Sequence, residues 1–184
     1  MKRRFIRLAV TCALAIVLPP IAHADISVRL NNAQLTSTSD VILIGRAVSS
    51  ETRWIDRTIV TAVTVQIDEA LKGGVSGQVE VILPGGADSN RRIPIAMTYP
   101  GAPSLQGGEQ VFLFLTHSAE VNGYVVSGFA QGKFSIITDA QGERRVSRDL
   151  RGSQLVEGAG ISRGTVTLAS LAEFRQEIVG LIGQ

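Results

Sequence analysis

Cysteine and histidine are nearly missing from this chain. Its 184 residues include one cysteine, Cys12, and two histidines, His23 and His117. Only His117 lies beyond residue 24. That part of the chain cannot form a disulfide, and its one imidazole falls short of the three or four protein ligands typical of zinc sites. We therefore predict no metal site, no cofactor and a stability that depends on apolar packing and hydrogen bonds.

Residues 1–24 have the features of an export signal. Four basic residues precede an apolar run from Leu8 to Leu18, and Ala22-His23-Ala24 matches the small-x-small pattern of a cleavage site. The run is too short to span a bilayer, and no later run reaches the required ~18–20 residues. We predict cleavage after Ala24, a secreted or periplasmic location and no membrane insertion after cleavage.

The basic character of the full chain comes from this leader. The leader holds four of the 18 basic residues and none of the 16 acidic ones, so the remainder has a formal net charge of −2. Binding to nucleic acid depends on a basic surface that neutralises phosphates. A slightly acidic domain lacks that surface, so we predict no nucleic-acid partner.

Short alternating runs separated by glycine-bearing turns dominate residues 25–150. In Thr58–Leu71, one face carries Ile59, Val63 and Val65, and the opposite face is expected to be largely solvated. The most apolar run, Gln110–Thr116, is expected at the centre of a sheet. Further strands are expected at 41–48, 78–83, 92–99, 124–129, 133–138 and 144–148. Without intervening helices, these strands favour an all-β antiparallel barrel or sandwich over a parallel α/β sheet.

The end of the chain changes pattern twice. Residues 151–166 are expected to form a flexible, exposed loop, because they hold four glycines and no apolar periodicity. Residues 167–184 predict an amphipathic helix, with Ser170 and Glu173 spaced as a capping box. Its apolar stripe is formed by Leu168, Leu171, Phe174, Ile178 and Leu181.

Two short motifs resemble those of netrin-like domains and tissue inhibitors of metalloproteinases. They are Leu71-Lys72-Gly73, at the end of a long strand, and Gly107-Gly108-Glu109-Gln110, which leads into the Val111–Leu115 strand. The resemblance covers about residues 39–134 and implies a five-stranded barrel of the OB type, with a secreted protease as partner. Those inhibitors bind the protease's zinc through an N-terminal cysteine held by disulfides. Here the expected mature chain begins with Asp25 and has no cysteine, so no functional residue is carried over.

Motifs for catalysis or phosphate binding are not evident. A G-x-S-x-G elbow is missing, and no glycine-rich turn opens a helix after a strand. We therefore assign no catalytic, cofactor-binding or metal-binding residue. The densest basic cluster is formed by Arg144, Arg145, Arg148 and Arg151. It is interpreted as a solvated edge strand protected by charge, with docking of an acidic partner or anionic glycan as the alternative.

A binding role is the function that remains. The predicted hairpin at 49–57 carries Trp54 between Arg53 and Arg57, and tryptophan and arginine are enriched at binding hot spots. Trp54 packed back against the barrel is the alternative. Together with Tyr99, these residues are the candidate partner-binding site of an exported, non-catalytic module. Its expected partner is an extracellular protein such as a protease. The alternatives are an envelope hydrolase with carboxylate catalysis and a structural envelope protein whose C-terminal helix docks to a neighbour.

Overall fold

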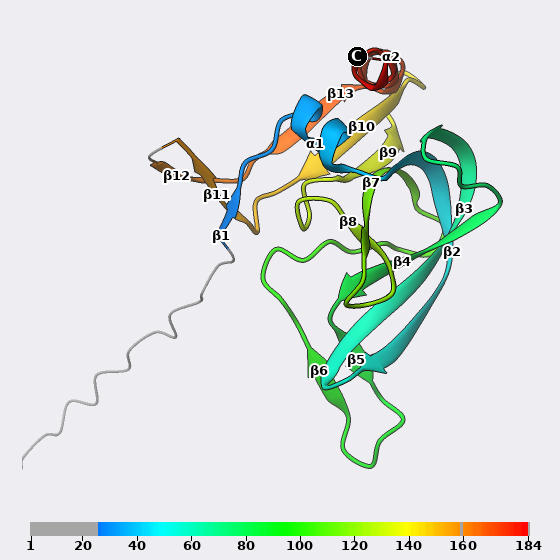
Figure 1. Ribbon diagram of the computed structural model, residues 1–184, viewed down its shortest axis with the longest axis vertical. Helices are drawn as coiled ribbons and strands as arrows, with labels where there is room; N and C mark the ends of the chain where they lie inside the picture. The colour runs from blue at the N-terminus through cyan, green and yellow to red at the C-terminus, as the bar shows by residue number, and fades with distance from the viewer. Residues whose placement is uncertain (1–25, 159, 184) are drawn as a thin grey trace, which may run out of the picture.

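The computed structural model describes residues 26–158 and 160–183, and it is mostly β with a C-terminal helix, as predicted (Figure 1). The proposed leader lies outside the described residues. The strands are β1 (Ile26–Val28), β2 (Val41–Ile55), β3 (Thr58–Lys72), β4 (Gln78–Pro84), β5 (Gly86–Asp88), β6 (Ile95–Met97), β7 (Gln110–Ser118), β8 (Gly123–Val126), β9 (Lys133–Thr138), β10 (Arg144–Asp149), β11 (Gln154–Glu157), β12 (Gly160–Arg163) and β13 (Val166–Ser170); the helices are α1 (Asn32–Thr38) and α2 (Leu171–Ile182). No helix among these residues is long and apolar enough to cross a membrane.

Eight strands form the main sheet, in the order β13-β10-β9-β7-β2-β3-β4-β8. Strand β8, at the end of this order, also pairs with β7. The strands β7, β2, β3, β4 and β8 are therefore connected in a closed series of pairings. The β4–β8 contact is parallel and consists of the single pair Val81 and Tyr124, whereas the other ladders of this sheet are antiparallel. Strand β7 contacts three neighbours, which confirms its predicted central position.

The two faces of β7 enter different parts of the core because its side chains alternate. Val111 and Leu113 pack with side chains of β2, β3 and β4 in one cluster. Phe112 and Phe114 point the other way and pack against α2, where Phe174 lies 5.0 Å from the ring of Phe112. All four of these β7 side chains are fully buried, so β7 connects the two clusters.

The β2–β3 hairpin is longer than predicted. Residues 49–57 were expected to connect two strands, but β2 continues to Ile55 and only Asp56 and Arg57 form the turn. Asp56 has φ 52°, a left-handed conformation that aspartate tolerates better than most residues. Both faces of β3 are apolar near this turn, because Val60 and Ala62 on the supposedly solvated face are buried with Ile82. The prediction of a wet face was therefore wrong at this end of the strand.

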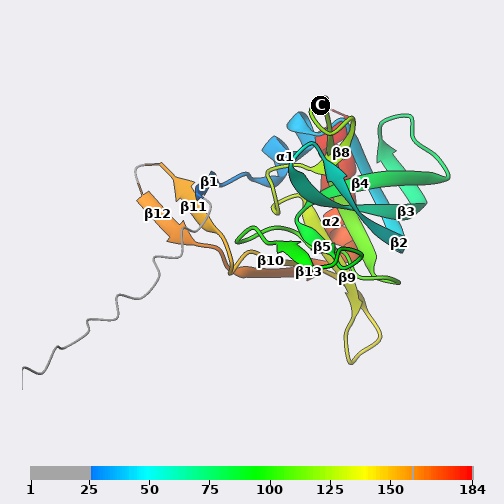
Figure 2. The ribbon, with the colours of Figure 1, turned by 90° about the horizontal axis from the view of Figure 1, so that it is seen from below.

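The end of the chain also differs from the prediction. The segment 151–166 contains β11 and β12 instead of an irregular loop, and β11 pairs with β1 in a small three-stranded sheet that projects from the body (Figures 1 and 2). Leu168 lies in β13 and is exposed, so the helical stripe begins at Leu171. Ser170 makes no side-chain capping bond, so the predicted capping box is not formed.

Helix α1 was not predicted, although its start carries a recognisable signal. The side chain of Asn31 accepts a hydrogen bond from the Gln34 backbone at 2.8 Å, and the side chain of Gln34 accepts one from the Asn31 backbone at 2.9 Å. This reciprocal arrangement is a capping box. The buried Leu35 then anchors α1 in the cluster beneath α2.

Candidate functional site

The predicted partner-binding residues lie at and near the end of the β2–β3 hairpin, but their side chains have different surroundings. The indole nitrogen of Trp54 donates to Asp88 at 2.8 Å, and the Arg91 guanidinium lies 4.6 Å above its ring. These contacts hold Trp54 against the β5–β6 hairpin. Arg53 forms an ion pair with Glu80 on β4.

Arg57 is exposed in the β2–β3 turn, whereas Tyr99 lines a separate groove. Arg53 is the register partner of Val60, which also lines this groove. Arg53 therefore lies on the same sheet face as the groove, whereas Trp54 is paired with the fully buried Ile59. Of the four predicted residues, Tyr99 lines this groove, and Arg53, Trp54 and Arg57 are not among its lining residues.

This groove has a volume of about 620 Å³ and lies where β4 and β8 separate. Its apolar lining is formed by Val60, Ile82, Pro84, Tyr99, Pro103, Val121, Val125, Val126 and Phe129. Thr58, Thr116, Ser118 and Ser127 also line it, and the hydroxyl groups of Thr116 and Ser127 are hydrogen-bonded to each other. Glu120 is the one charged residue among the lining residues, so the groove offers no cation to a phosphate.

Two aromatic residues give the groove its character. Tyr99 is 41% exposed, which leaves much of its ring available for contact. Phe129 has φ 65°, in the left-handed region where residues with a bulky side chain are rare. Such conformations occur preferentially at ligand-binding and other functional sites. The groove therefore combines an available aromatic ring with a locally strained backbone.

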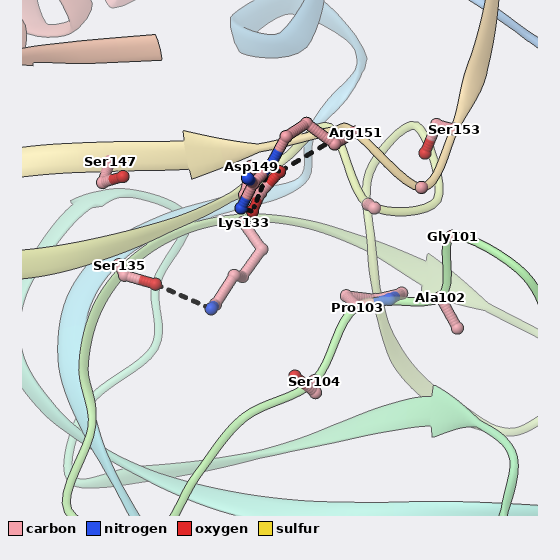
Figure 3. Close-up of a pocket in the computed structure, with 12 residues that line it drawn as sticks. Gly101, Ala102, Pro103, Ser104, Lys133, Ser135, Ser147, Asp149, Arg151 and Ser153 are labelled. Atoms are coloured by element: carbon pink, nitrogen blue, oxygen red, sulfur yellow. Dashed lines mark hydrogen bonds and ion pairs between the residues drawn. The ribbon is translucent and has the colours of Figure 1, made fainter. Parts of the chain in front are cut away.

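A second cavity, of about 680 Å³, is polar and was not predicted (Figure 3). Loop residues 101–104 face the strands β9 and β10, whose Lys133, Ser135, Ser147 and Asp149 point into the cavity. We call this cavity the polar cleft. Lys133 and Ser135 lie two residues apart on β9 and therefore share one face, and Ser135 pairs with Ser147 of β10. The signal available in the sequence was these two polar positions on one face of a strand.

A closed set of hydrogen bonds links three side chains at the polar cleft. The Lys133 ammonium donates to Glu109 at 2.6 Å and to Ser135 at 2.8 Å, and the Ser135 hydroxyl donates to Glu109 at 2.7 Å. Burial raises the pKa of Glu109, but hydrogen bonds from the Gln106 backbone, Lys133 and Ser135 outweigh it, so the pKa lies below its ordinary value. Lys133 is thus paired with a carboxylate that stays ionised.

Changing Glu109 to glutamine tests this arrangement. Because the pKa of Glu109 is lowered in the folded protein, ionised Glu109 contributes fully to stability at neutral pH. This contribution declines as the pH falls below 4.5, the ordinary pKa of a glutamate, and it is lost once the pH falls below the pKa of Glu109 in the folded protein. We expect E109Q to reduce the free energy of unfolding by about 1–3 kcal/mol at pH 7, with a much smaller difference at pH 3. Urea unfolding at both pH values measures this, and E51Q on the exposed face of β2 is the matched control.

The comparison with known proteins adds no relative. No protein-family model matches the chain, and no curated protein matches it.

Proposed function

We propose that the chain is an exported, non-catalytic binding module built on an OB-like barrel, and that it binds a segment of a protein partner in the apolar groove. The groove carries this proposal, because it joins an exposed tyrosine, a strained phenylalanine and an aliphatic floor in one cavity. Ligand sites are typically concave, mostly apolar and of this size.

The pairing of five strands supports the OB-like barrel. In chain order, the five strands are β2, β3, β4, β7 and β8. The first strand pairs with the second, the second with the third and the third with the fifth. The fifth strand then pairs with the fourth, and the fourth pairs with the first. The third and fifth strands run parallel, and the remaining pairs run antiparallel. A single sheet that returns to its starting strand in this order fits a five-stranded Greek-key barrel.

The location of the groove also fits that architecture. OB folds bind ligands on the face of their second and third strands, between the loop joining strands one and two and the loop joining strands four and five. Here those strands are β3 and β4, which contribute Val60 and Ile82, and the β7–β8 loop contributes Val121. The predicted Arg57 lies in the β2–β3 turn, which joins the first and second of the five strands. It is next to Thr58, which lines the groove.

The lining chemistry favours a peptide with apolar side chains. Aliphatic residues and two aromatic rings offer hydrophobic contact, and the lining residues Thr58 and Ser118 carry hydroxyl groups that can hydrogen-bond to a peptide backbone. A nucleic acid would meet Glu120 and no lining cation. The resemblance to netrin-like inhibitors suggests a secreted protease as the source of the peptide segment. Assays against a panel of secreted metalloproteases test that suggestion. If the protein inhibits none of them and co-elutes with none of them, the suggestion is wrong.

The hydrolase alternative is less well supported. A glycosidase needs a carboxylic acid whose pKa is raised so that it can donate a proton. Every described carboxyl group with a shifted pKa has it lowered: Glu69, Asp88, Glu109, Asp139 and Asp149. A serine–lysine pair needs its lysine free to take a proton from the serine, but the Lys133 ammonium forms an ion pair with Glu109 at 2.6 Å.

The structural alternative relied on an unpartnered helical stripe. In the fold, Leu171, Phe174 and Ile178 are buried against the sheet of the same chain. The stripe therefore needs no neighbouring protein, and the binding module remains the better-supported function.

Changing Val121 to glutamate tests the groove. Peptides selected from a random 12-residue phage library on the purified protein are expected to be rich in apolar side chains, and V121E should weaken their binding at least about tenfold. The reason is that the peptide would bury an unpaired carboxylate on the groove wall. Calorimetry with the selected synthetic peptides measures the change.

The matched control is Ile161→Glu, which introduces the same charge at an exposed apolar residue on β12, outside the groove. It should leave peptide binding unchanged. Failure to select any peptide, or equal binding by wild type and V121E, would contradict the proposed function. Circular dichroism of both variants checks that the fold is retained.

A further inference from the structure

Arg148 differs from the other arginines of the cluster predicted at residues 144–151, because it is partly buried and has no ion pair among the described residues, whereas Arg144 is exposed. Arg145 pairs with Asp139, and Arg151 pairs with Asp149. Strand β10 is not a sheet edge, because β13 pairs along its other side, so the edge-strand interpretation was wrong. Within the described part of the chain, Arg148 forms no ion pair.

The Arg148 guanidinium is partly buried and poorly hydrogen-bonded. It lies 4.8 Å above the ring of Phe134, and its Nη1 donates to the carbonyl of Gln131 at 3.3 Å. Its Nε is buried and has no hydrogen-bond partner among the described residues. Burial, followed by the nearby charge of Arg29, lowers the pKa of Arg148. Arginine nevertheless remains protonated. Among the described residues, its charge therefore has no counter-ion.

A cavity of about 470 Å³ connects Arg148 with Arg29, between the N-terminal segment and β10. Arg29 lies 3.0 Å from Glu157, whose side chain is 70% exposed. Three charged residues line this cavity: Arg29, Arg148 and Glu157. The amide side chains of Asn31, Asn32 and Gln34 complete the polar lining.

We propose that this cavity binds a small oxyanion, such as phosphate or a carboxylate, between the guanidinium groups of Arg148 and Arg29. Guanidinium groups bind such anions through charge-assisted and often bidentate hydrogen bonds. The anion would supply the counter-charge that Arg148 lacks. This site is independent of the apolar groove, since the two cavities share no lining residue.

Thermal unfolding of the purified protein with sodium phosphate or sodium acetate tests the proposal, with sodium chloride at matched ionic strength as reference. We expect a saturable rise in Tm of about 2–6 °C at low millimolar concentrations of at least one oxyanion. Arg148→Met keeps an apolar side chain over Phe134 and should reduce this rise to less than about 1 °C. General stabilisation by phosphate does not saturate and affects both proteins equally.

Arg144→Met is the matched control, because Arg144 lies on the same face of β10 but is exposed, and its guanidinium donates a hydrogen bond to Gln110 at 3.4 Å. It should retain the full rise in Tm. Comparing phosphate with acetate identifies which oxyanion is preferred. The absence of a saturable rise with either anion, or an equal rise in R148M, would overturn the proposal. Calorimetric titration of phosphate and acetate into R148M and wild type, at a temperature where both are folded, gives an independent readout.

Discussion

Replacement of Phe174 by alanine is expected to lower the free energy of unfolding by about 3–5 kcal/mol, the usual range for a large aromatic removed from a core. Phe174 lies at the centre of the cluster that joins α2 to the sheet. Its ring centroid is 5.0 Å from that of Phe112, 6.4 Å from that of Phe114 and 4.7 Å from that of Phe134. With no cysteine beyond residue 24, no disulfide can compensate for the loss.

Urea denaturation followed by circular dichroism measures this change. Val179→Ala is the matched control on the same helix, since Val179 is 45% exposed and should lose less than about 1 kcal/mol. An equal effect of both substitutions would show that α2 does not depend on its buried face. Because α2 closes one side of the sheet, F174A should also expose apolar surface to a hydrophobic dye.

Replacement of Gly45 by alanine is the second large effect expected. A Cβ at this position would lie 2.4 Å from the carbonyl oxygen of Gln66 and 2.9 Å from a methyl group of Val65. The oxygen belongs to the backbone of the paired strand β3, so it cannot move without displacing the ladder. We expect G45A to cost about 3 kcal/mol or more, at or above the usual upper limit for overpacking.

The control for this substitution is Gly74→Ala, in the connection after β3, where the added methyl meets no atom within 4 Å. G74A should change the free energy of unfolding by less than about 0.5 kcal/mol. Chemical denaturation of both variants separates local crowding from the general effect of removing a glycine. Near-native stability of G45A would mean that β2 and β3 approach less closely than described.

Sequence pattern predicted most strands of the main sheet because the information is local. The run Gln110–Thr116 contains five consecutive apolar residues, 111–115, and lies within β7, where these five are buried on both faces. Glycine turns separated it from its neighbours. By contrast, β1 pairs with β11, more than 120 residues away, and no local pattern indicates which distant segment completes such a ladder. Helix α1 was missed because its seven residues give too few turns for a clear apolar stripe.

The candidate site was only partly predictable. Tyr99 was one of the four predicted partner-binding residues, and it lines the groove. The rest of the groove depends on β8 lying beside β4, which brings Val125 toward Val60 and Ile82. The apolar residues on the second face of β3 were the available signal, because a solvated face has no need of Val60 and Ala62. Trp54 was predicted to bind a partner, with packing within the chain as the alternative, and its side chain contacts Asp88 and Arg91 of the same chain.

Titration of the isotope-labelled protein with a selected apolar peptide, followed in methyl NMR spectra, tests the central claim most directly. The account predicts that the largest shifts fall on methyl groups of Val60, Ile82, Val121 and Val125, while Ile161 on β12 stays unchanged. Shifts concentrated instead at Ala102 and Ala130, which line the polar cleft, would contradict it.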